Sequence, residues 1–145
     1  MHTEEYEKAC AQALKFLGPR FLSRLELTQK LKRKEYSSEV IEEVLTQLEE
    51  WNYINDERLA AEVGRLFIEE GKYGCEYIRQ KMYQRGLPIP EVVREYDELP
   101  AAFRLVERYF PEGEVEGPKL FRFLTNRGYR ASTVREVANT LGLWE

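Results

Sequence analysis

The chain has 145 residues, 33% of them charged and 43% hydrophobic, and its formal net charge is −4. No apolar run approaches the ~18 residues that a bilayer span needs, and the acidic start Met1–Tyr6 has no apolar core, so we expect no membrane span and no signal peptide. The acidic balance disfavours a dedicated nucleic-acid-binding domain, which is usually basic.

The first third of the chain predicts three helices. Residues 4–17 carry apolar side chains at a three-to-four spacing: Tyr6, Ala9, Cys10, Ala13, Leu14 and Leu17. Gly18-Pro19 ends this helix, because proline cannot continue the hydrogen-bond ladder. Ser23-x-x-Glu26 is a capping box that opens a second helix, and Ser37-Ser38 offers N-caps for a third.

The middle third predicts three more helices. Asn55-Asp56 is a cap pair for a long helix, and Gly74 or Cys75 starts the next one. Gly86 stands where a left-handed residue commonly closes a helix. Pro90 then suits the first turn of a third helix.

The last third repeats this pattern. Pro100 starts a helix that Pro111-Glu112-Gly113 breaks, and Gly117-Pro118 opens the next. Gly128 closes that helix, and Ser132 is expected to cap the last one.

One apolar pattern recurs in all three parts. Its spacing is the same in Leu27, Leu31, Tyr36, Ile41; in Ile78, Met82, Leu87, Val92; and in Leu120, Leu124, Tyr129, Val134. Leu45, Tyr96 and Ala138 continue it. Successive copies are offset by 51 and then 42 residues, close to the ~40–47 of helical solenoid repeats. The sequence therefore predicts an all-α fold of three tandem three-helix repeats in an elongated, curved array, with repeats at 1–53, 54–98 and 99–145.

Catalytic and metal-binding patterns are missing from the sequence. The only histidine is His2, so Ser-His or Cys-His chemistry has no base, and no phosphate-binding loop is present. Cys10 and Cys75 have no metal-ligand spacing and are expected to be reduced thiols of a cytoplasmic protein. We therefore expect a binding protein without cofactor or metal, not an enzyme.

Charges segregate by helix. Cations concentrate on the middle helix of each repeat and its flanks, and the candidate partner-binding residues are Arg24, Lys30, Lys32, Arg33, Lys34, Arg79, Lys81, Arg85, Lys119, Arg122, Arg127 and Arg130. The third helix of the first repeat carries Glu39, Glu42, Glu43, Glu49 and Glu50 and no cation. Lys34, Arg85 and Arg127 occupy one position of the repeat, where favourable interaction with the helix dipole and contact with a partner explain them equally well.

Three segments resemble the RecX family of bacterial recombinase regulators. They are residues 48–60 with Trp51-Asn52-Tyr53-Ile54-Asn55-Asp56, residues 74–87 ending in Arg85-Gly86-Leu87, and residues 119–129 ending in Arg127-Gly128-Tyr129. Asn52 replaces a family glycine and tolerates the left-handed conformation nearly as well, Leu59 replaces a phenylalanine, and Glu35 stands where the later copies have Gly86 and Gly128.

The resemblance implies a non-catalytic modulator of recombination and DNA repair within the SOS response. Such a protein would bind the groove of the RecA–single-stranded DNA filament and suppress ATP hydrolysis and strand exchange, and it is expected to be a monomer. Two alternatives stay open. A three-helix unit could bind single-stranded or duplex DNA directly but weakly, or the chain could be a helical scaffold for another protein.

Overall fold

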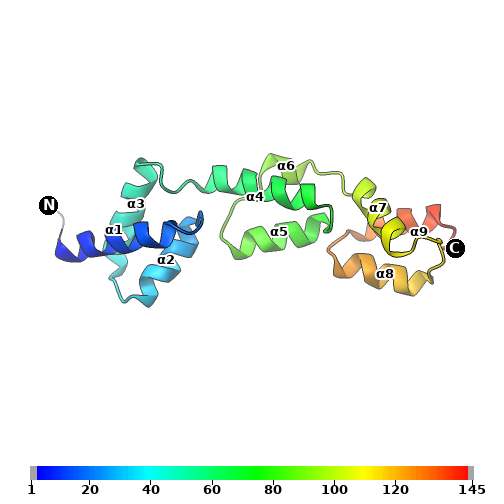
Figure 1. The fold of residues 1–145 in the computed structure, drawn as a ribbon, viewed down its shortest axis with the longest axis horizontal. Coiled ribbons are helices and arrows are strands. Elements are labelled where there is room, and N and C mark those ends of the chain that lie inside the picture. Colours follow the sequence, from blue (N-terminus) through cyan, green and yellow to red (C-terminus); the bar gives the residue numbers. More distant parts are fainter. Residues whose placement is uncertain (1–2, 144–145) are drawn as a thin grey trace. The chain divides into compact units, whose positions relative to one another are not determined.

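The computed structural model describes residues 3–143, and His2 lies outside them. All regular secondary structure in this range is α-helical, which confirms the predicted fold class. The helices follow one another in threes (Figure 1): α1 (Glu4–Leu17), α2 (Arg24–Arg33), α3 (Ser38–Glu50); α4 (Asp56–Glu70), α5 (Cys75–Gln84), α6 (Glu91–Arg94); and α7 (Leu99–Tyr109), α8 (Gly117–Asn126), α9 (Ala131–Thr140). We call these the first, second and third helix triplets.

Contacts group the chain into two compact units. The first unit holds the chain up to Ala60 together with Gln84–Pro88, and the second holds Ala61–Tyr83 together with the chain from Ile89 onward. Most of the second triplet therefore shares a unit with the third. The division into repeats at 1–53, 54–98 and 99–145 remains a prediction, with boundaries that fall between helices.

The core of the first unit lies where α3 packs against both α1 and α2. Leu27 and Leu31 of α2 and Leu45 and Leu48 of α3 are almost fully buried in it. The predicted capping box is present: the Glu26 amide donates to the Ser23 hydroxyl over 3.1 Å, and the Ser23 amide donates back to the Glu26 carboxylate over 2.9 Å. The Ser37 side chain caps α3, also as predicted.

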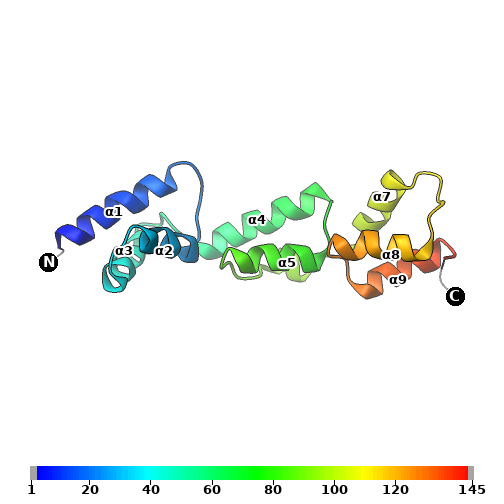
Figure 2. The same cartoon turned by 90° about the horizontal axis from the view of Figure 1, so that it is seen from below.

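In the second unit, α7, α8 and α9 enclose a separate core built around Leu120, Leu124, Val134 and Val137. Figures 1 and 2 both show α8 and α9 side by side. The α4–α6 part is closed by Val93, which is fully buried and lies where a side chain on Gly64 would have to go.

The repeated apolar positions are confirmed with one exception. The first two anchors of each copy are fully buried: Leu27, Ile78 and Leu120, then Leu31, Met82 and Leu124. In the second copy the predicted residue Val92 is 40% exposed, and Val93 is buried instead. Helix α6 has only 4 residues after Pro90, so its inward-facing position differs from those of α3 and α9. Leu14, expected in the apolar stripe of α1, is also exposed.

Each second helix ends on a residue with positive φ. Gly86 and Gly128 adopt φ of 72° and 83°, as predicted, and Glu35 adopts 67° without being a glycine. Asn52, at the end of α3, has φ of 63°, which confirms that asparagine takes the place of glycine there.

The expected cap of the last helix was wrong. Helix α9 starts at Ala131, so Ser132 lies in its first turn and Arg130 is the N-cap residue. The Arg130 amide instead donates to the carboxylate of Glu98, over 2.8 Å.

Candidate partner-binding surfaces

The end of α2 carries the densest group of free cations. Lys32, Arg33 and Lys34 are all exposed, and among residues 3–143 none of them forms an ion pair. Arg122 on α8 is exposed in the same way. These predicted residues are available to an acidic partner.

A basic hollow of about 470 Å³ lies beside this group, between the end of α1, the α1–α2 loop and α2. It is lined by the cations Lys15, Arg20, Lys30 and Arg33, by Phe16, Pro19 and Leu22, and by Glu26 and Gln29. The Lys30 ammonium lies 5.2 Å from the centre of the Phe16 ring and makes a cation–π contact with it. We call this site the basic hollow.

Glu26 is the carboxylate that lines the basic hollow, and its charge is already matched. Arg85 donates to both of its oxygens, over 3.0 Å and 2.9 Å, and Arg20 lies 3.6 Å away. Burial alone would raise the pKa of Glu26, but the bonds from Arg85 and from the Ser23 amide, with the charges of Arg85 and Arg20, lower it overall. Arg85 is therefore ion-paired within this unit, and its role in partner binding stays a prediction.

Arg24 is likewise engaged within the first unit. Its guanidinium binds the carboxylates of Glu42 and Glu49 on α3. Its amide donates to Asp56 over 2.9 Å. The acidic face of α3 thus neutralises one of the predicted partner-binding cations.

In the second unit three of the six predicted cations lie against aromatic rings. Lys81 lies over Tyr77 at 5.3 Å, and Lys119 lies over Phe110 at 5.6 Å. Arg127 lies 3.8 Å from the centre of Phe123 and also faces Tyr109. Their charges remain accessible in part, but their positions are explained by packing.

The residues Lys34, Arg85 and Arg127, which share one position of the repeat, therefore have three different environments. Lys34 is exposed, Arg85 is ion-paired and Arg127 is stacked on an aromatic ring. The repeat fixes where the cation lies along the helix and not what it contacts.

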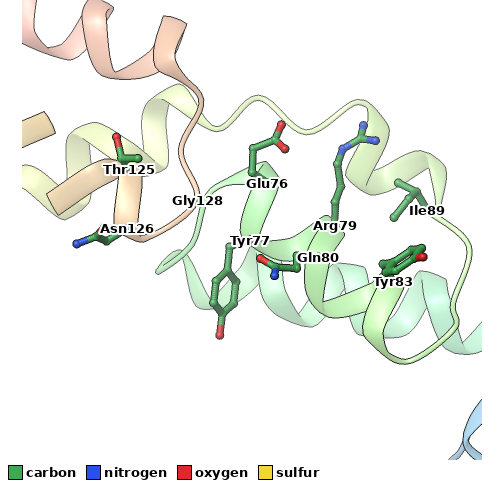
Figure 3. A pocket seen from close by; sticks show the side chains of 9 residues that line it. All are labelled: Glu76, Tyr77, Arg79, Gln80, Tyr83, Ile89, Thr125, Asn126 and Gly128. Atoms are coloured by element: carbon green, nitrogen blue, oxygen red, sulfur yellow. The ribbon is translucent and has the colours of Figure 1, made fainter. Parts of the chain in front are cut away.

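A second hollow, of about 530 Å³, lies between α5 and the end of α8 (Figure 3). Arg79 and Tyr83 extend toward Ile89 on one side, and Thr125 and Asn126 line the other. Tyr83 is 80% exposed. This hollow is close to neutral and rich in hydrogen-bonding groups, in contrast to the basic hollow.

Backbone hydrogen bonds hold the two sides of this second hollow together. The Gly74 amide donates to the Arg127 carbonyl over 2.8 Å, and the Glu76 amide donates to the Gly128 carbonyl over 3.0 Å. A Cβ on Gly128 would lie 2.3 Å from the Tyr77 Cβ, so only glycine permits this approach.

The first unit has an equivalent junction made with side chains. The Ser23 hydroxyl donates to the Arg85 carbonyl, and Gly86 lies directly against Leu25. In both units, then, the start of one second helix contacts the residues that close the next.

Glu98 is the one nearly buried carboxylate among the described residues, with 4% exposure. One of its oxygens accepts from the Cys75 amide over 2.7 Å, and the other accepts from the Arg130 amide. It therefore caps α5 and α9 at once. Arg130 also reaches Cys75 Sγ at 3.2 Å and Glu76 at 3.4 Å, and Arg79 Nε lies 3.5 Å from the same sulfur.

Sequence reasoning missed Glu98 and the α1 contribution to the basic hollow. Lys15 and Phe16 stand at the end of a helix that the apolar pattern marks only as packing. Their role follows from the loop Gly18–Leu22, which brings the end of α1 beside α2.

Two kinds of feature are absent from the described residues. Residues 3–143 contain no group of three or more His, Cys, Asp or Glu side chains that could hold a metal ion. None of the helices in that range is both long and apolar enough to cross a membrane.

Comparison with known proteins gives a consistent result. The family model described as "RecX, first three-helix domain" matches residues 9–48. The regulatory protein RecX of Prosthecochloris aestuarii is 32% identical, covering 97% of this chain and 98% of its own length, and that of Chlorobaculum tepidum is 32% identical over 92% and 89%. The crystal structure of RecX from Lactobacillus salivarius has a TM-score of 0.77 at 20% identity, over 97% of this chain and 98% of that one, and shares the fold. The chain therefore belongs to the RecX family of regulatory proteins.

Proposed function

We propose that this protein is a negative modulator of the RecA recombinase. It binds in the groove of the RecA–single-stranded DNA filament and suppresses ATP hydrolysis and strand exchange. Membership of the RecX family supports this function. The observation that carries the site is the group of exposed cations without ion pairs at the end of α2, Lys32, Arg33 and Lys34.

The mode of action that we propose is binding without catalysis, as a cytoplasmic monomer. A chain of several helical units offers several weak contacts, and their combined affinity exceeds that of each one. A filament repeats its surface along its length, which suits a ligand with repeated elements.

The test is inhibition of RecA ATPase activity on single-stranded DNA. Wild-type protein should lower the rate in a concentration-dependent way, and the triple variant Lys32→Glu, Arg33→Glu, Lys34→Glu should need at least about tenfold more protein for the same effect, because each reversed contact costs on the order of 1 kcal/mol. The matched control is Lys72→Glu, Arg108→Glu, Arg135→Glu, which reverses the same number of exposed cations elsewhere. Equal loss of inhibition in both variants would mean that the effect depends on net charge alone. Absence of inhibition by the wild type would refute the function.

Direct DNA binding without RecA is expected to be weak. Titrations of single-stranded and duplex DNA at two salt concentrations measure it, because each neutralised phosphate adds about 0.7–0.9 to the slope of log affinity against log salt. A steep slope with tight binding would favour the nucleic-acid-binding alternative. Capture of another protein from a lysate that lacks RecA would favour the scaffold.

A further inference from the structure

Among the described residues, the second and third triplets have aromatic rings at the positions equivalent to those that line the basic hollow. Phe16, Phe67 and Tyr109 occupy the same position at the end of the first helix of each triplet. In the second triplet, Tyr77 packs on Phe67 with ring centres 6.1 Å apart and stacks on Tyr73 at 3.9 Å. In the first triplet, Glu26 stands at the position of Tyr77 and leaves the space to cations.

The third triplet fills the space in a similar way. Phe123, at the position of Lys30, packs against Tyr109 and Phe110 with ring centres 5.3 Å and 5.1 Å apart. In the second and third triplets, aromatic rings thus occupy the space between the first two helices. In the first triplet the same space is a hollow of about 470 Å³. Since the same fold closes this space with apolar rings, its opening in the first triplet is not required by packing.

The charge of the basic hollow is only partly compensated, because Arg20 forms an ion pair with Glu26 and the other three cations form none among the described residues. Four cations line it, and the single carboxylate, Glu26, already accepts two hydrogen bonds from Arg85. Lys15 and Arg33 are exposed and have no ion pair among residues 3–143. Cations brought together in this way repel one another, and an anionic ligand relieves that repulsion.

The surroundings favour a protein ligand over nucleic acid. Phe16 and Pro19, above the buried Leu22, give the basic hollow an apolar wall that suits hydrocarbon side chains beside the carboxylates. Helix α3 of the same unit carries Glu39 and Glu50 on its exposed face, and the chain as a whole has a net charge of −4, so a long phosphate backbone meets little further positive charge on this unit. Within the same unit Arg24 already binds two carboxylates of α3, which shows the kind of contact that α2 makes.

We propose that the basic hollow binds a carboxylate-rich protein segment that also carries apolar side chains. Lys15, Arg20 and Arg33 would bind the carboxylates at the rim, and Phe16 and Pro19 would contact the apolar side chains. This proposal deepens the proposed function by naming the chemistry of the partner segment. It rests on that function only for the identity of the protein that supplies the segment.

The experiment measures fluorescence anisotropy of a labelled peptide of alternating glutamate and leucine, with the full chain and without any recombinase. We expect saturable binding, weakened about tenfold or more in Lys15→Gln, Arg33→Gln, because two charge-assisted contacts are lost. The control Lys72→Gln, Arg135→Gln removes the same charge from exposed positions outside the hollow and should change binding less than about twofold. A peptide of alternating glutamate and serine should bind more weakly than the leucine peptide.

Three results would overturn the proposal. They are equal weakening by the two double variants, absence of peptide binding, and tighter binding of a labelled oligothymidylate that depends on the same Lys15 and Arg33. A second measurement needs no variant: amide chemical shifts of the wild type should move on peptide addition at Phe16, Leu22 and Lys30, and shifts confined to other residues refute the site. If the wild-type chain does not bind the peptide but still inhibits the ATPase, this proposal is rejected and the proposed function stands.

Discussion

The first and third helix triplets solve the same packing problem with different chemistry. In the third, aromatic rings fill the space between the first two helices, and a glycine closes the second helix against Tyr77. In the first, the corresponding space is open and cationic, the closing residue is Glu35, and a Glu26–Arg85 ion pair joins the neighbouring segment. The third triplet is arranged for stability, and the first leaves charge available for a partner.

The largest test of this comparison is Gly128→Ala. At φ of 83° the new Cβ would lie 2.3 Å from the Tyr77 Cβ and 2.4 Å from its backbone nitrogen. We expect a loss of about 4 kcal/mol in the free energy of unfolding, from overpacking together with left-handed strain. Urea unfolding followed by circular dichroism measures it. Glu35 is exposed at the equivalent position, so the matched variant Glu35→Ala should lower the free energy of unfolding by less than about 0.5 kcal/mol. Similar losses at both positions would contradict the comparison.

The next test removes one aromatic ring from the third triplet and one from the first. Phe123→Ala should cost about 3 kcal/mol, because Phe123 contacts Tyr109, Phe110 and the Arg127 guanidinium. Phe16→Ala should cost about 1.5 kcal/mol, since that ring lies at the open basic hollow. Thermal unfolding of the two variants gives the ranking, and the reverse order would show that the first triplet depends on its ring as much as the third.

The ion pair of the first unit predicts a pH dependence. The pKa of Glu26 is lowered in the folded protein, so its contribution is fully present above the unfolded value of 4.5 and is lost as the pH falls through the lower folded value. Glu26→Gln should cost about 1.5 kcal/mol at neutral pH, because Arg85 keeps only neutral acceptors. Urea unfolding at neutral pH and below pH 4.5 should show the two proteins converging in acid; a constant difference across pH would assign the effect to packing.

The smallest expected effect is a gain. Glu35→Gly should stabilise the protein by about 0.5–1 kcal/mol, because glycine adopts φ of 67° without steric cost. The same variant leaves the basic hollow intact and should keep its peptide binding. A loss of stability would mean that the Glu35 side chain makes a contribution beyond the turn.

Much of the fold could be predicted because it depends on local rules. The Ser23 capping box, the left-handed Gly86 and Gly128 and the buried anchors from Leu27 to Leu124 follow from spacing and backbone preference. The inward position of α6 could not be predicted to the residue, since a helix of 4 residues gives no usable periodicity and either Val92 or Val93 fits it.

The candidate site was less predictable, because charge in a sequence does not show its partners. In the sequence, Arg24 and Arg85 cannot be told apart from Lys32 and Arg33, since all four are cations on or beside a second helix. In the structure, however, Arg24 and Arg85 bind carboxylates that are distant in the chain. The basic hollow depends on the loop that returns the end of α1 to α2, which carries no pattern of its own. Pairing of this kind becomes visible only with the three-dimensional contacts.

The double cap made by Glu98 has a consequence for dividing this chain into fragments. A cut just after residue 98 would take the carboxylate away from the Arg130 amide at the start of α9, and a cut just before it would leave the Cys75 amide at the start of α5 without its acceptor. A buried carboxylate left with one of its two donors is costly. Limited proteolysis should therefore spare the α6–α7 connection, and a C-terminal fragment that folds by itself should begin within α4, near Ala61.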